Sequence, residues 1–210
     1  MSWSELIDAA RAVVQQAAAP ADGSFLQGWP TPQAPRIEPA VLPVVSWLAP
    51  AVRAAPPGAL RQLAESLLRQ QGELSWRQTY RASQASAAFL DRYGWCQIFG
   101  PGGPLSAAHL ACGVLLLGPE TQYPAHRHRA AELYVPLSGS AWWQRAEAPF
   151  ALRRPGEAIH HRPLEWHAMR TEDEPLLALY LWRGEGLGES AQLAMEAPSP
   201  PGNAASEPHD

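Results

Sequence analysis

The chain has 210 residues, 46% apolar and 17% charged, so it is long enough for one well-packed domain and too apolar to be disordered throughout. Its net charge of -4 at pH 7 argues against nucleic-acid binding, which needs a basic surface to displace counterions from phosphates. All 16 basic residues are arginine, and Cys96 and Cys112 are the only cysteines, which excludes Schiff-base lysine chemistry, a disulfide framework and a thiolate metal site.

Residues 1–94 show helical patterns interrupted by proline-rich segments. Ser2-x-x-Glu5 resembles a capping box and precedes apolar residues at helical spacing. Residues 20–35 contain four prolines and two glycines, which predicts a loop. The apolar residues between 60 and 68 predict a second amphipathic helix, and Ser75 a further helix that ends at Gly94. This half predicts a helical cap over a second layer, and it carries no recognisable chemical motif.

From Trp95 to about residue 190 the pattern changes to short strands separated by Gly and Pro. Many short strands with frequent turns and no intervening helices indicate an antiparallel sandwich or barrel. Residues 191–210 are rich in Pro, Ala and Ser, which predicts a flexible tail. The strands are expected at 95–99, 109–117, 121–128, 132–138, 140–145, 149–154, 157–162, 167–172 and 175–183.

Six of the seven histidines fall between His109 and His167, within the strand-rich half. His126 and His128 are two residues apart, so on a strand both point to one face. Glu132 and Tyr134 share a face in the same way. Burying two imidazoles and a carboxylate without a partner would cost on the order of several kcal/mol. We therefore predict a site for a divalent transition metal ion with open coordination positions.

The segment from Ile159 to Met169 offers three histidines that could complete this site: His160, His161 and His167. A lone histidine is more often an exposed or hydrogen-bonded residue than a metal ligand. We interpret His109, His160 and His209 in that ordinary way.

The spacing His126-x-His128-x3-Glu132-x6-Gly139 resembles the first cupin motif, and Pro155-Gly156 followed by histidine resembles the second. His167 lies well beyond this Pro-Gly pair, and no asparagine follows at the usual place. With Tyr123, Tyr134 and the string IHHRPLEWHAM, the pattern is similar to the cupin dimethylsulfoniopropionate (DMSP) lyases of the DddQ type. The resemblance covers about residues 110–185.

This resemblance implies a mainly β fold, a single cupin barrel under an N-terminal helical cap, with residues 1–94 as the cap, 95–190 as the barrel and 191–210 as the tail. It implies metal ligation by His128, Glu132 and His167, with His126 as a fourth ligand or a residue behind the ligands. Iron, zinc, manganese, nickel and cobalt all remain candidates for the ion.

The implied reaction is a β-elimination that releases dimethyl sulfide and leaves acrylate. The resemblance places Tyr134 at the metal or as the base, and Tyr123 as a second site tyrosine. Since a cation lowers the pKa of a nearby phenol, Tyr134, on the face of Glu132, is the expected base. Tyr123 is the rival base, and we expect it to bind or orient substrate.

The leaving end of DMSP is a sulfonium cation, which aromatic rings attract. The resemblance implies that Trp182 is a pocket aromatic, and Tyr180 lies on the same strand face. Trp142 and Trp143 are adjacent, so only one of them faces the barrel interior.

Three other functions share these ligands: a metal-dependent cupin oxygenase, a noncatalytic small-molecule-binding cupin, and a similar lyase for another β-substituted carboxylate. We expect a cytoplasmic enzyme with a small-molecule substrate and no nucleic-acid or membrane partner, because the chain shows neither an apolar span nor a secretion signal. A homodimer is left open as its assembly.

Overall fold

The computed structural model describes residues 3–17, 24–31 and 38–194. Helical segments dominate the first half and antiparallel strands the second, and the predicted strands from 95 to 183 are all present, with bounds that shift by one to two residues. No helix in the described part is long and apolar enough to cross a membrane. The elements are α1 (Trp3–Ala17), η2 (Pro43–Trp47), α2 (Leu48–Ala54), α3 (Ala59–Arg69), η3 (Gln71–Glu73), β1 (Trp76–Arg77), α4 (Ala87–Asp91), β2 (Tyr93–Phe99), β3 (Leu110–Leu117), β4 (Gln122–Arg127), β5 (Ala131–Ser138), β6 (Ala141–Arg145), β7 (Ala151–Arg153), β8 (Ile159–His161), β9 (His167–Thr171), β10 (Leu176–Arg183) and β11 (Gln192–Leu193).

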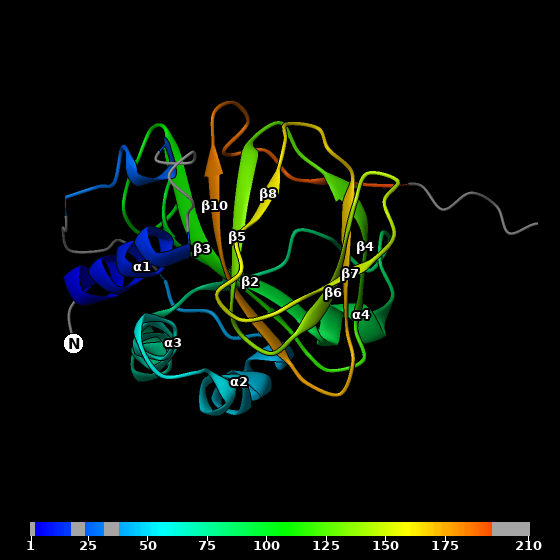
Figure 1. The fold of residues 1–210 in the computed structure, drawn as a ribbon, viewed down its shortest axis with the longest axis horizontal. Helices are drawn as coiled ribbons and strands as arrows, with labels where there is room; N and C mark the ends of the chain where they lie inside the picture. Colours follow the sequence, from blue (N-terminus) through cyan, green and yellow to red (C-terminus); the bar gives the residue numbers. More distant parts are fainter. Residues whose placement is uncertain (1–2, 18–23, 32–37, 195–210) are drawn as a thin grey trace, which may run out of the picture.

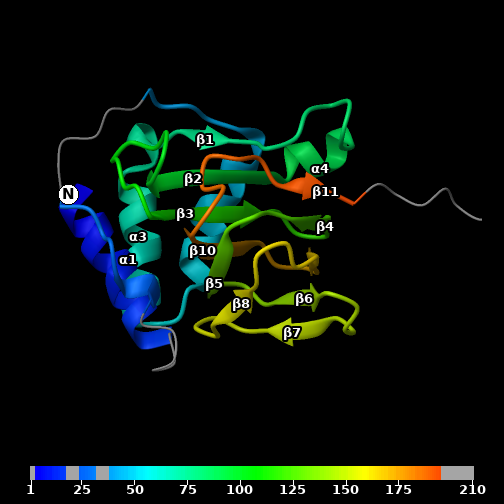
Figure 2. The same cartoon turned by 90° about the horizontal axis from the view of Figure 1, so that it is seen from above.

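The strands form two antiparallel sheets that face each other. One sheet has six strands in the order β1-β2-β3-β10-β5-β8, and the other has five in the order β11-β4-β9-β6-β7. Figure 1 shows α1, α2 and α3 on the outer side of the six-stranded sheet, with the five-stranded sheet on the opposite side. Figure 2 shows β1, β2, β3 and β10 following one another across the larger sheet. The expected mainly β barrel with an N-terminal helical cap is confirmed.

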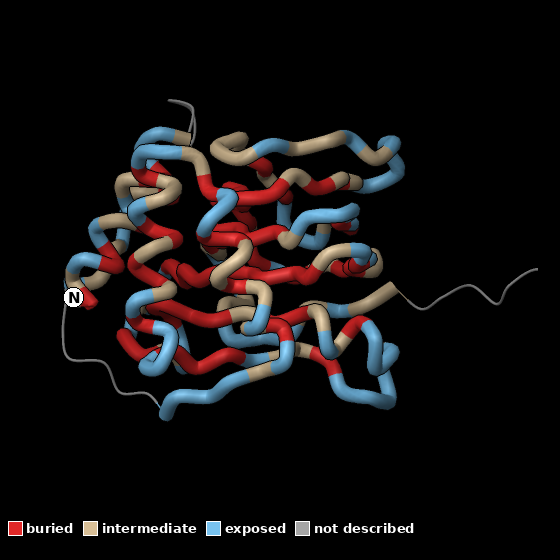
Figure 3. The backbone as a smooth tube through the Cα atoms, turned by 90° about the horizontal axis from the view of Figure 1, so that it is seen from below, coloured by how far each residue is buried: buried red, intermediate tan, exposed pale blue. Residues whose placement is uncertain are grey.

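Strand β10 separates the two apolar cores of the molecule. Its residues Leu177, Leu179 and Leu181 pack with the helices in one core, while Ala178 and Tyr180 pack into the second core between the sheets. This is the alternation expected of a strand buried on both faces. Figure 3 shows buried residues along the strands and exposed residues in the connecting loops.

The predicted helix from Ser75 to Gly94 is wrong over most of its length. Trp76 and Arg77 instead form the edge strand β1, in which Trp76 pairs with Cys96 and Arg77 with Trp95. Only 87–91 is helical, and the Ser86 hydroxyl caps it by accepting the Phe89 amide at 3.2 Å. Pairing with β2 satisfies the backbone of the first part, so the local helical spacing is overridden.

Two other expectations fall partly outside the described residues. Ser2 of the expected capping box lies outside them, although the helix that it precedes is present as α1. In the segment predicted as a flexible tail, Gln192 and Leu193 pair with Arg127 and His126 of β4, and residues 195–210 lie outside the described part.

Candidate functional site

The metal-binding residues predicted from sequence come from three neighbouring segments. His126 is on β4, His128 follows that strand directly, and Glu132 is the second residue of β5. His167 begins β9 and is paired with His126 across the sheet. The chain between β5 and β9 returns to this part of the barrel. The pairing of β9 with β4 then places His167 beside His126.

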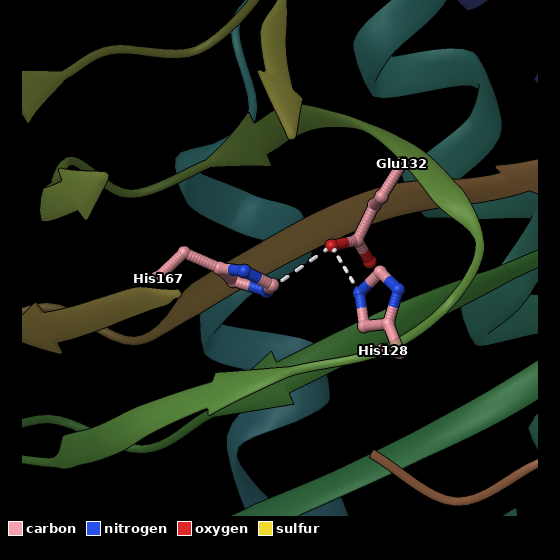
Figure 4. A group of neighbouring side chains, drawn as sticks. All are labelled: His128, Glu132 and His167. Carbon is pink, nitrogen blue, oxygen red and sulfur yellow. Dashed lines mark hydrogen bonds and ion pairs between the residues drawn. The ribbon is translucent and has the colours of Figure 1, made fainter. Parts of the chain in front are cut away.

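Three of these side chains converge on one point. The Nε2 atoms of His128 and His167 lie 3.0 and 3.3 Å from Oε2 of Glu132. Figure 4 shows the two imidazoles directed at this oxygen, one from the start of β9 and the other from the segment directly after β4. All three side chains are buried, and Glu132 is only 1% exposed. One ligand atom from each of the three lies within 4.8 Å of the others.

Backbone contacts orient the imidazoles of the site for ligation. Nδ1 of His128 lies 2.9 Å from the carbonyl oxygen of Ala130, and Nδ1 of His167 lies 2.9 Å from that of Glu165. A carbonyl only accepts, so each Nδ1 donates its proton, and each Nε2 is directed at the carboxylate of Glu132. This arrangement is typical of metal-binding histidines.

The donor set fits a divalent metal ion. Two imidazole Nε2 atoms and a carboxylate oxygen face one another in a buried space, and a metal ion between them could take all three as ligands. Burial alone would raise the pKa of Glu132, but His128 and His167 hold it well below its usual range. The carboxylate is therefore ionised, as a metal ligand must be.

His126 lies beside this group without joining it. Its ring meets the ring of His167 edge-on, with centroids 4.1 Å apart, and its Nδ1 lies 2.9 Å from the carbonyl oxygen of Pro124. Burial and the neighbouring His167 hold the pKa of His126 well below its usual range. His126 is thus a neutral imidazole packed against His167, and it also lines the pocket.

A pocket of roughly 330 Å³ opens from this group, within the range of small-molecule sites. Its walls come from both halves of the chain and from the segment that connects β10 to β11. Its lining includes Gln78, Thr79, Tyr93, Trp95, Tyr123, His126, Glu132, Tyr134, Tyr180 and Trp182.

Tyr134 lies on the wall next to the carboxylate. It is buried, and burial together with the charge of Glu132 raises the pKa of its hydroxyl well above its ordinary value. Its ring packs near Trp143 and Tyr180, with centroids 5.4 and 6.4 Å away. Trp143 is therefore the tryptophan that faces the barrel interior, while the indole N–H of Trp142 donates to Glu172 on the outside.

Trp182 contacts the predicted metal ligands directly. Its indole Nε1 donates to Oε1 of Glu132 at 2.6 Å, and its ring stacks on His128 with centroids 4.1 Å apart. From the sequence, Trp182 is expected only as a pocket aromatic that contacts the sulfonium cation of the substrate. The structure shows that the same side chain also orients the carboxylate.

Tyr123 also lines the pocket. Its ring stacks on His126 with an interplanar angle of 8° and a centroid distance of 4.0 Å. Its hydroxyl lies 3.2 Å from that of Tyr80 and 3.3 Å from that of Tyr93. Burial, followed by the neighbouring Tyr80 and Tyr93, raises the pKa of Tyr123 well above its ordinary value.

The remaining histidines differ in their surroundings. His161 is buried and stacks on His167 at 4.0 Å, but neither of its ring nitrogens has a hydrogen-bond partner. Burial and the neighbouring His167 lower the pKa of His161 to about 2, so this ring is neutral. His160 is half-buried near Phe25, His109 is exposed, and His209 lies outside the described residues.

Sequence reasoning missed the pocket residues that precede the barrel. Thr79 and Tyr93 line the pocket and Tyr80 contacts Tyr123, because β1 pairs with β2 and carries the following segment to this side of the barrel. No local pattern marks these residues, and the predicted helix over this segment concealed them.

Comparisons with known proteins agree with this architecture. The family model of dimethylsulfoniopropionate lyase matches residues 30–178. The DMSP lyase DddQ of Ruegeria pomeroyi is 38% identical over 110 residues, which are 52% of this chain and 55% of that protein. A second curated relative, from Cereibacter sphaeroides, is 35% identical over 148 residues, or 70% of this chain and 61% of that protein. The chain thus matches little more than half the length of these relatives.

Solved structures match over nearly the whole chain. The crystal structure of DMSP lyase DddQ from Ruegeria pomeroyi superposes with a TM-score of 0.81 and 29% identity, covering 91% of this chain and 95% of that one. A chain from the crystal structures of the DMSP lyases RdDddP and RnDddQII gives a TM-score of 0.80 and 30% identity, covering 92% and 97%. The cupin barrel with its helical cap is therefore shared with these structures.

Proposed function

Because this chain belongs to the dimethylsulfoniopropionate lyase family, we propose that it cleaves DMSP to dimethyl sulfide and acrylate by β-elimination at a bound divalent metal ion. The observation that carries the proposal is the buried group of His128, Glu132 and His167 at the base of an aromatic pocket. DMSP has a carboxylate at one end and a sulfonium cation at the other. The two ends match a metal site and aromatic walls, respectively.

His128, Glu132 and His167 would hold the ion, with His126 against His167 as a supporting residue or a fourth ligand. When bound there, a divalent transition metal ion would neutralise the charge that develops on the substrate carboxylate and favour the ionised form of a nearby phenol. The donor set of two imidazoles and one carboxylate suits iron, zinc, manganese, nickel or cobalt.

We assign the proton transfer to Tyr134. Its hydroxyl is next to the carboxylate of Glu132, so it belongs to the part of the pocket where the substrate carboxylate would sit. As a phenolate, Tyr134 takes the proton from the carbon next to the substrate carboxylate. The electron pair of that C–H bond forms the double bond of acrylate, and the C–S bond breaks with its pair leaving on dimethyl sulfide.

Tyr180 and Trp182 would receive the sulfonium end. Both rings line the pocket, and their centroids are 6.2 Å apart. A desolvated cation over an aromatic face gains about 2 kcal/mol. Burial around these rings also keeps water from the charge that forms during the reaction.

The same residues would serve a β-substituted carboxylate with a different leaving group, and this is the second candidate. Nothing in the ligand group distinguishes the two, because both reactions use the same metal, base and carboxylate contact.

The test is to incubate the metal-loaded protein with DMSP and to measure dimethyl sulfide by gas chromatography. We expect turnover of at least ~1 s⁻¹, within the ordinary range for enzymes. Much slower release, with faster elimination from another β-substituted carboxylate, would favour the second candidate. Oxygen consumption with either substrate would instead indicate an oxygenase.

A further inference from the structure

A continuous line of hydrogen bonds runs from the pocket mouth to Tyr123. The indole Nε1 of Trp95 donates to the hydroxyl of Thr79 at 3.0 Å, and that hydroxyl lies 2.9 Å from the hydroxyl of Tyr93. Tyr93 in turn lies 3.3 Å from the hydroxyl of Tyr123. All four residues line the pocket that contains Glu132.

The indole of Trp95 determines which hydroxyl donates and which accepts along this line of hydrogen bonds. An indole N–H can only donate, so it occupies an acceptor site of Thr79 and leaves the Thr79 proton free to be donated onward. Tyr93 is the partner within reach of that proton.

The same reasoning continues to the end of the line. Since Tyr93 accepts from Thr79, its own proton is available for Tyr123. The hydroxyl of Tyr80 also lies 3.2 Å from that of Tyr123, and either hydroxyl can be the donor there. Tyr123 then accepts from Tyr93, and its own proton can be donated to a ligand in the pocket.

We propose that Trp95, Thr79 and Tyr93 polarise Tyr123 as a hydrogen-bond donor to the carboxylate of the substrate. Tyr123 is then a stabiliser of negative charge rather than a base, which separates its role from that of Tyr134. Trp95, Thr79 and Tyr93 are positioning residues that act through Tyr123. This inference rests on the proposed function only in taking the ligand to be a small carboxylate.

The physical basis is the cooperativity of aligned hydrogen bonds. Each donor that already accepts a hydrogen bond becomes a stronger donor, by about 10–30% per bond. A donor held in place also needs no reorganisation when charge develops on the substrate. The line is anchored in the fold, since Gln78, next to Thr79, donates to the carbonyl oxygen of Tyr93 at 2.9 Å.

The experiment compares Thr79→Val with Thr79→Ser in the full-length, metal-loaded protein. Valine removes the hydroxyl at nearly constant volume, and serine keeps it. The ligand is acrylate, a small carboxylate, and its dissociation constant is measured by titration calorimetry. We expect about a two- to fivefold weaker affinity in Thr79→Val, and wild-type affinity in Thr79→Ser. Tyr93→Phe interrupts the same line and is expected to give a similar loss.

A double-mutant cycle separates this role from a purely structural one. If Thr79 acts through Tyr123, Thr79→Val has no further effect on acrylate affinity or on kcat/KM in a Tyr123→Phe background. A loss that persists in that background, or equal affinities for the valine and serine variants, would overturn the inference. So would a wild-type protein that does not bind acrylate.

These outcomes are distinct from failure of the proposed function. A protein that shows the expected acrylate pattern but releases no dimethyl sulfide from DMSP supports the polarised donor and refutes the substrate.

Discussion

The indole N–H of Trp182 donates to Oε1 of Glu132 at 2.6 Å, while the other carboxylate oxygen, Oε2, faces the imidazoles of His128 and His167. One side chain therefore fixes the carboxylate that completes the metal-binding group. Because the ring of Trp182 also stacks on His128, it holds two of the three converging residues at once. Its two functions, orientation of the ligands and contact with the substrate, are separable by substitution.

Trp182→Phe keeps an aromatic ring but removes the indole N–H. Glu132 then loses the partner of Oε1, and we expect metal affinity to fall ~10–100-fold, as is usual when a group that orients a ligand is removed. Competition with a chelator of known affinity measures this loss. Unchanged metal affinity would mean that the short hydrogen bond does not orient the carboxylate.

Trp182→Ala removes the ring as well. We expect binding of the sulfonium substrate to weaken by about thirtyfold more than binding of acrylate, which has no cation, since a desolvated cation–π contact is worth roughly 2 kcal/mol. Both affinities are measured at saturating metal, so that loss of the ion does not confuse the result. Equal losses for the two ligands would limit Trp182 to packing and to orientation of Glu132.

Alanine at His128, Glu132 or His167 should deplete bound metal and abolish turnover, because each substitution removes one of three converging ligand atoms. Elemental analysis of the purified variants gives the occupancy. His160→Ala is the control, since His160 is the half-buried histidine near Phe25 on the cap side of β8 and is outside the group. Full occupancy in all three ligand variants would disprove the assignment.

Tyr134→Phe keeps the packing against Trp143 and removes the hydroxyl. If Tyr134 is the base, activity falls at least ~10²–10⁴-fold, the usual contribution of a positioned general base, while metal occupancy largely survives. Tyr123→Phe is the matched comparison, and we expect a smaller loss with much of it in KM. Near wild-type turnover in Tyr134→Phe, or the larger loss in Tyr123→Phe, would contradict this division of roles.

Gly113 gives Tyr180 its place in the pocket. The two residues are paired across β3 and β10, and a Cβ at position 113 would lie 2.6 Å from Cζ of Tyr180. Gly113→Ala should therefore displace the tyrosine ring, lower stability by about 1–3 kcal/mol through overpacking, and raise KM for DMSP. Denaturant unfolding and steady-state kinetics measure the two effects. A Cβ at position 113 would also clash with the carbonyl oxygen of Cys96, so Tyr180→Ala should relieve only the part of the destabilisation that comes from the tyrosine ring.

The sequence alone was enough to predict the barrel strands, and it singled out the residues that we propose as metal ligands. Side chains along a strand alternate between its two faces, so the alternation of residue types and the turn residues between 95 and 183 predicted these strands. The same alternation predicted that Leu179 and Tyr180 lie on opposite faces of β10. His128 and Glu132 are only four residues apart, and their geometry depends on one turn between β4 and β5. The family resemblance supplied His167, which is far from them in the chain.

Only the tertiary structure decided what surrounds those ligands. Thr79 and Tyr80 reach Tyr123 because the edge strand β1 pairs with β2, and 43 residues separate Tyr80 from Tyr123 in the chain. Likewise, 50 residues separate Trp182 from Glu132. Contacts of this kind depend on strand order and register, which many distant residues determine together. No local periodicity encodes them, so the polar lining of the pocket appears only when the sheets are assembled.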